Sequence, residues 1–241
     1  MRFNVIAAGI AMMATAWAAT PQEHFDAGRY TEAAEQLEGE LREAPSAEGY
    51  LNVALALQKA GKTAEAVVNY ERALLLDPGL SAAKNSLAEL AAEKGIQLPP
   101  RRWTDDVVAI AHPDTLVALG STISWVAMFA LLFLVLGPRR PVWMTAAAVC
   151  SLALGSMLFA LGWVADPRLA EASLAVVTSE NGADVLTQPA GNSDRIAELP
   201  PGTPVGVLSP RGAWTYVDLA RGARGWVQTS RLTPVVPGET L

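Results

Sequence analysis

The spacing of apolar and polar positions changes twice along the chain, and each part predicts a different kind of element. Residues 20–98 repeat apolar positions with the period of amphipathic helices. Two uncharged apolar runs follow, at residues 115–136 and 142–165. From residue 172 onward, short stretches rich in Val, Thr, Gly and Pro are typical of strands joined by turns. The pattern therefore predicts a helical region, two long apolar helices and a C-terminal β module.

A secretory signal peptide is predicted at residues 1–18. Arg2 supplies its basic start, and the apolar run at residues 3–13 is short for a membrane span. Ala16 and Ala18 are small residues at the positions that signal peptidase reads. The alternative is an uncleaved N-terminal anchor. In either case we expect the segment that follows to be exported.

Residues 20–98 contain an internal repeat with a period of 33 residues. At this spacing Gly28 aligns with Gly61, and Pro45 aligns with Pro78. The second copy resembles the tetratricopeptide repeat at these positions: Tyr50, Val53, Ala54, Leu57, Gly61, Ala66, Tyr70, Ala73 and Pro78. This resemblance implies about two repeats of paired helices, closed by a last helix near residues 80–94. Such a stack is an α-helical solenoid.

The resemblance also implies a peptide-binding face on the solenoid. Tetratricopeptide stacks are concave on the side formed by the first helix of each repeat. Asn52 and Asn85 lie 33 residues apart, where such repeats often place a polar residue that faces a peptide, and Lys59 adds positive charge. The alternative is that all three are ordinary surface residues.

The two apolar runs are each long enough to cross a membrane. The turn at residues 137–141 carries Arg139 and Arg140 and no acidic residue, and positive residues stay in the cytoplasm. We therefore expect a two-pass hairpin in the cytoplasmic (inner) membrane, with both soluble parts on the periplasmic side. Residues 99–114 are either a plain linker or a short helix at the membrane surface.

Small residues recur inside both apolar runs and permit close helix contact. They are Gly120 and Ser124 in the first run, and Ala147, Ser151 and Gly155 in the second. Either the two helices of the hairpin use them against each other, or a further partner helix does.

The C-terminal module at residues 172–236 resembles a bacterial SH3 domain. The segments that carry the resemblance are residues 199–205, 212–217 and 225–227. The resemblance implies a small SH3-like β-barrel. The family's usual arginine-then-small motif is replaced by residues 185–189, which alters the common ligand groove.

Three aromatic residues of this module are candidates for a binding groove. Trp214, Tyr216 and Trp226 offer flat rings to a peptide or a glycan. The alternative role for these rings is packing in the core of the module.

Composition excludes most kinds of chemistry. The net charge of −6 argues against nucleic-acid binding. The one cysteine, Cys150, lies in an apolar run, so it cannot meet His24 or His112 in an aqueous site. No phosphate-binding loop or metal-ligand pattern is present. We expect no enzyme activity, no cofactor and no metal.

The order of signal peptide, tetratricopeptide repeats, membrane hairpin and SH3 domain resembles the BatE-like proteins of the Bacteroides aerotolerance (Bat) group. That likeness implies a membrane-anchored scaffold beside von Willebrand A domain membrane proteins and a cytoplasmic MoxR-type ATPase. A second hypothesis is an envelope anchor that binds peptidoglycan through the SH3 domain and recruits a cell-wall enzyme through the repeats. A third, a redox or transport component, requires a role for Cys150.

Overall fold

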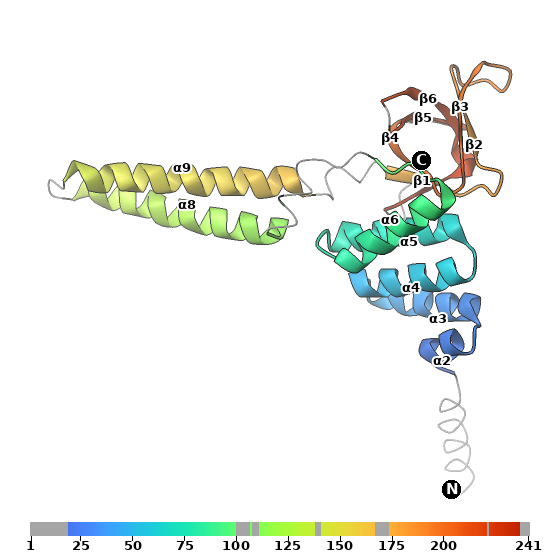
Figure 1. The fold of residues 1–241 in the computed structure, drawn as a ribbon. Helices are drawn as coiled ribbons and strands as arrows, with labels where there is room; N and C mark the ends of the chain where they lie inside the picture. Colours follow the sequence, from blue (N-terminus) through green and yellow to red (C-terminus); the bar gives the residue numbers. More distant parts are fainter. Residues whose placement is uncertain are drawn as a thin grey trace, which may run out of the picture.

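The computed structural model describes residues 19–99, 107, 111–137, 141–166, 174–220 and 222–236. Figure 1 shows a stack of short helices, a hairpin of two long helices that extends away from it, and a curled sheet at one end of the stack. The predicted signal peptide at residues 1–18 and most of the predicted linker at residues 99–114 lie outside the described residues.

The stack consists of helices that pack on one another in chain order. They are α2 (Pro21–Asp26), α3 (Tyr30–Glu43), α4 (Ala47–Lys59), α5 (Thr63–Leu76) and α6 (Ser81–Lys94). This confirms the prediction of a helical N-terminal region. The tetratricopeptide assignment itself stays a prediction.

Local sequence signals fix where these helices begin and end. Thr20 forms a capping box with Glu23 at the start of α2, and the side chain of Ser46 accepts a hydrogen bond from the backbone of Gly49 at the start of α4. Gly28 and Gly61, which the 33-residue shift aligns, both have positive φ angles, of 76° and 79°. A residue with a side chain adopts that conformation only with strain, so glycine allows the tight turn into α3 and into α5.

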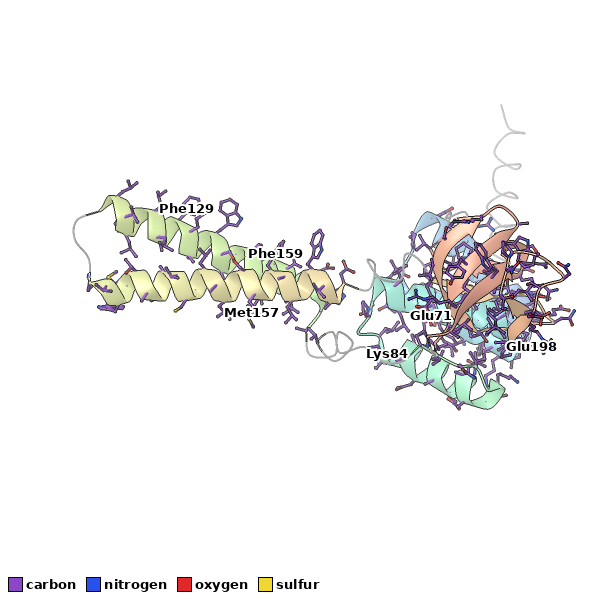
Figure 2. The ribbon with its side chains drawn as sticks, turned by 90° about the horizontal axis from the view of Figure 1, so that it is seen from above. Glu71, Lys84, Phe129, Met157, Phe159 and Glu198 are labelled. Carbon is purple, nitrogen blue, oxygen red and sulfur yellow. The ribbon has the colours of Figure 1, made fainter. Side chains whose placement is uncertain are left out.

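The hairpin consists of α8 (Pro113–Leu136) and α9 (Val142–Ala165). Both helices are long and apolar enough to cross a membrane. Large apolar side chains project outward along the hairpin: Phe129 is 61% exposed and Met157 is 63% exposed (Figure 2). The hairpin therefore presents an apolar surface that no other described part of the chain covers.

Small residues bring α8 and α9 together at a spacing of seven. The buried positions that follow this spacing are Pro113, Gly120 and Ala127 on α8, and Ala148, Gly155 and Gly162 on α9. A Cβ atom added to Gly155 would lie 2.6 Å from Ser124 Oγ and 2.9 Å from the carbonyl oxygen of Gly120. The backbones therefore touch where only a hydrogen atom fits.

Two of the small residues noted in the sequence do not take part in this contact. Ala147 and Ser151 are exposed, whereas Gly120, Ser124 and Gly155 meet between the helices. A four-residue step turns about 40° around an α-helix, whereas a seven-residue step turns only about 20°. Two long helices that run side by side therefore stay in contact through the seven-residue spacing.

The C-terminal part is a single antiparallel sheet with the strand order β3-β2-β6-β5-β4-β1-β7. The strands are β1 (Leu174–Val177), β2 (Ala183–Leu186), β3 (Arg195–Leu199), β4 (Pro204–Arg211), β5 (Trp214–Asp218), β6 (Arg224–Gln228) and β7 (Leu232–Pro234). Val185, Val217 and Val227 are among the buried residues on its inner face.

The sheet curls but does not close, so the prediction of a β-barrel was wrong in this respect. The terminal strands β3 and β7 each pair with one neighbour and not with each other. Closure requires two free edges to meet. At the end of β7 the chain instead contacts the helical stack, where Nε of Arg72 on α5 donates to the carbonyl oxygen of Val235 at 2.9 Å.

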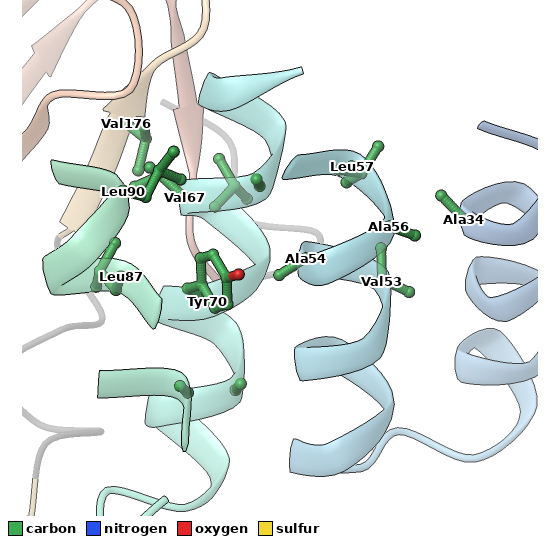
Figure 3. Close-up of a cluster of buried hydrophobic side chains, with 14 of the residues drawn as sticks. Ala34, Val53, Ala54, Ala56, Leu57, Val67, Tyr70, Leu87, Leu90 and Val176 are labelled. Atoms are coloured by element: carbon green, nitrogen blue, oxygen red, sulfur yellow. The ribbon is translucent and has the colours of Figure 1, made fainter. Parts of the chain in front are cut away.

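The sheet and the helical stack share one hydrophobic core. Val176 of β1 and Val235 are fully buried in the same cluster as Val67 of α5 and Leu90 of α6 (Figure 3). Gly202, before β4, approaches so closely that an added Cβ would lie 2.8 Å from Cδ1 of Ile96. The two modules thus pack together, although the hairpin separates them in sequence.

Candidate functional site

An aromatic surface runs across the outer face of the sheet. Along β5, Thr215 and Val217 are fully buried, whereas Trp214 and Tyr216 point the other way and are half-buried. On β6, Trp226 also points outward and is half-buried. This alternation is the two-residue period of a strand. We call Arg211, Trp214, Tyr216 and Trp226 the aromatic face.

Tyr216 and Trp226 lie directly opposite each other on β5 and β6. Their ring centroids are 5.0 Å apart with an interplanar angle of 42°, and Cζ of Arg211 lies 5.6 Å from the centre of a Trp226 ring. These distances correspond to an aromatic pair with a cation–π contact. The three side chains hold one another in place and leave part of each ring exposed.

The structure therefore brings together two of the three predicted groove residues. Trp214 lies on the same face, two residues before Tyr216 on β5 and opposite Gln228. Trp226 does not belong to the inner core of the sheet. Whether these residues bind a ligand stays a prediction.

The predicted peptide-binding residues of the helical stack are all exposed. Asn52 and Lys59 lie seven residues apart on α4 and so share one side of that helix, and Asn85 lies on α6. Within the part of the chain that the structure describes, no hydrogen bond or ion pair joins these three side chains. Their role also stays a prediction.

A groove that the sequence reasoning missed lies on a different side of the stack. It has a volume of about 620 Å³ and is lined by residues from α3, from α5 and from the start of α4: Glu38, Leu41, Arg42, Pro45, Tyr50, Asn69, Arg72, Leu75 and Leu76. We call it the α3–α5 groove. Tyr50 precedes Asn52 by two residues, which is about 200° around a helix. The groove and Asn52 therefore lie on opposite sides of α4.

Two polar residues of α5 stand out in this groove. Asn69 is only 4% exposed, and its Nδ2 donates to the carbonyl oxygen of Glu65 at 3.0 Å. Arg72, one turn further on, is half-buried, and burial lowers the pKa of its guanidinium while Tyr50 and Glu38 partly offset that effect. The available sequence signal was that Asn69, Glu71 and Arg72 interrupt the apolar residues 66–68 and 73–76 of α5.

The remaining chemistry-bearing residues are dispersed. Cys150 is an exposed free thiol on the hairpin. Nδ1 of His24 lies 3.0 Å from Glu32, and Nε2 of His112 lies 3.9 Å from Asp77. In the described part of the chain no group of three His, Cys, Asp or Glu side chains is placed to hold a metal ion.

Comparison with known proteins gives a family for one part of the chain. Residues 179–234 match the family model of the bacterial SH3 domain, a segment that includes strands β2 to β7 and the aromatic face. No curated protein and no solved structure matches the chain.

Proposed function

We propose that this chain is a non-enzymatic, membrane-anchored scaffold that uses its helical stack and its SH3 domain together to hold protein partners at a membrane surface. The proposal rests above all on the docking of these two modules through a shared core. Docked modules present their surfaces in a fixed relative orientation, which is useful for arranging two partners side by side.

The hairpin is the proposed anchor. Only 11% of the most apolar part of each helix is buried in the protein, so neither resembles the core helix of a soluble domain. Their exposed Trp, Phe, Leu and Met side chains would be unfavourable in water and favourable in hydrocarbon. Within the two helices the described residues include no Lys, Arg or Glu, and Asp114 lies in the first turn.

The docking also supports the proposed two-pass topology. Side chains as deeply buried as Val67 and Val176 must share one compartment, so the chain between them has to cross the membrane an even number of times. A hairpin of two spanning helices meets this condition. Because Arg139 and Arg140 stand in the turn, we place the turn in the cytoplasm and both modules outside it.

Cysteine labelling of a Cys150→Ala background tests this arrangement. Lys59→Cys on α4 and Gln188→Cys in the sheet should both react with a membrane-impermeant maleimide in intact cells that have a permeable outer layer. Arg140→Cys should react only after the cells are lysed. Labelling of Lys59→Cys and Gln188→Cys from opposite sides of the membrane would contradict the proposal.

The architecture further supports a place in a Bat-type envelope complex, with von Willebrand A domain membrane proteins as partners. A photo-crosslinking benzophenone residue at Asn52 or Asn85 of the full chain tests this in cells. Recovery of von Willebrand A proteins from these positions, and not from Gln188, an exposed position next to the sheet, supports the assignment. Recovery of cell-wall enzymes alone would contradict it.

The aromatic face favours a second candidate function, an envelope anchor that binds peptidoglycan. Half-exposed indole and phenol rings stack on the flat faces of sugars as well as on peptides. The test is binding of the full chain, in a mild detergent, to purified cell-wall sacculi. Trp226→Ala should abolish this binding, whereas Leu208→Ala, which removes an exposed apolar side chain from β4, should not. The full chain is required because Val176 and Val235 pack on the helices.

A further inference from the structure

The α3–α5 groove has the properties of a binding site for a charged peptide. Its volume of about 620 Å³ lies within the range of roughly 300–1,000 Å³ that is typical of ligand sites. Apolar side chains from three elements line it, among them Leu41, Tyr50 and Leu76. Such a lining favours apolar side chains of a ligand, and the polar residues at its edge determine which charge the ligand carries.

The charge of the groove is exceptional for the stack. Residues 20–98 contain 13 acidic and 7 basic residues, yet the groove is lined by Arg42 and Arg72 against one acid, Glu38. Glu38 makes no ion pair with either arginine among the described residues. An incoming carboxylate is therefore complementary to this groove, whereas most of the stack's surface repels it.

Arg72 is the central group. Its Nε donates to Val235 and its Nη2 lies 3.5 Å from the carbonyl oxygen of Pro234, so in the described structure Nη1 has no protein partner. Partial burial removes water from this guanidinium, and carbonyl oxygens carry only part of a negative charge. A carboxylate bound at Arg72 would add the direct ion pair that Glu38 does not make, through charge-assisted hydrogen bonds, which are stronger where water is excluded.

We propose that the α3–α5 groove binds an acidic segment of a partner protein, in which an Asp or Glu flanked by apolar residues pairs with Arg72. This inference rests on the proposed scaffold function and names the chemistry of one partner. The partner segment would then bind on one side of α4, whereas Asn52 and Lys59 lie on the opposite side. Because Arg72 also donates to Val235, which directly follows β7, the bound segment would lie next to the SH3 domain.

Selection from a phage-displayed library of short random peptides, using the purified full chain in an uncharged detergent, tests the proposal. Selected peptides should be enriched in Asp or Glu flanked by apolar residues. Arg72→Gln should weaken their binding about tenfold or more, since it removes the charged donor. The rim variant Arg42→Gln should cause a smaller loss that shrinks at high salt.

Arg72→Gln also removes the hydrogen bond to Val235, so Leu76→Glu provides a second groove variant that keeps Arg72 in place. Its added carboxylate in the groove should repel the same peptides to a similar extent. Arg224→Gln, which removes the charge of an exposed arginine on β6, is the matched control and should bind like the wild type. Peptides with no acidic preference, or binding that survives both groove variants and is lost in Asn52→Ala or Lys59→Ala, overturn the proposal. If crosslinking still recovers partners in that case, the scaffold function stands and only the groove assignment fails.

Discussion

Two neighbouring valines on β1 allow the docking of the modules to be tested separately from the stability of the sheet. Val176 and Val177 are both completely buried, with 0% exposure. Because successive strand residues point to opposite faces, Val176 packs on the helical stack and Val177 inside the sheet. The substitutions Val176→Ala and Val177→Ala therefore remove the same atoms from two different interfaces.

The expected cost is similar for the two variants. Each loses two buried carbon atoms, at about 0.8 kcal/mol per carbon for transfer from water. The cavity left behind adds to this, so we expect a loss of about 2 kcal/mol from the free energy of unfolding in each case. The two variants differ in the interface that is weakened, which is the docking interface in Val176→Ala and the core of the sheet in Val177→Ala.

Amide hydrogen exchange of the full chain, followed by mass spectrometry, distinguishes the two effects. In Val176→Ala, amides of α5 and α6 should exchange faster together with those of β1, because docking protects both modules. In Val177→Ala, faster exchange should be confined to the sheet. If α5 and α6 keep wild-type protection in Val176→Ala, the modules do not stabilise each other, and the central support for the scaffold proposal is lost.

Two further predictions concern the hairpin and the stack. Gly155→Leu should force α8 and α9 apart and lower the thermal stability of the purified protein, since the nearest atoms of Ser124 leave no room for a side chain. Ala153→Leu, an exposed position about 200° around α9 from Gly155, is the control, and equal effects would refute the contact. Burial raises the pKa of Tyr70, so the folded state favours the neutral phenol. The stability that this contributes is present below the unfolded pKa of about 10 and is lost as the pH rises above it. Chemical denaturation below and above this pH gives the free energy of unfolding in each condition. The decrease in that free energy at high pH should be smaller in Tyr70→Phe than in the wild type, and an identical decrease would contradict the assignment.

Much of the element order was readable because its signals are local. The 33-residue recurrence of Gly28 and Gly61 reflects a backbone conformation that glycine adopts with little strain. The apolar runs predicted at residues 115–136 and 142–165 correspond to α8 and α9. Short stretches rich in Val, Thr, Gly and Pro indicated strands from residue 172 onward, and the match of residues 179–234 to the bacterial SH3 domain confirms the kind of module.

The candidate sites were harder to predict, because a site depends on which elements meet. Tyr216 and Trp226 were chosen as aromatic residues, but only the strand register showed that they lie opposite each other. Arg72 was not predicted as a site residue, since a single arginine in a helix is ordinarily a solvated surface residue. Its importance comes from burial beside Tyr50 and from its hydrogen bond to Val235, which is 163 positions away in the chain.

The sequence by itself determined the kinds of element, because each kind has a signal that lies within one continuous stretch of chain. These signals are the helical period, the alternation of a strand, the length of an apolar run and the glycine at a turn. The tertiary structure alone decided how these elements combine. It left the sheet open at β7, joined Val176 to the helical core and set the seven-residue contact through Gly155. Each of these outcomes depends on the shape and burial of surfaces that are distant in the chain, and no local pattern of residues encodes which surface another will meet.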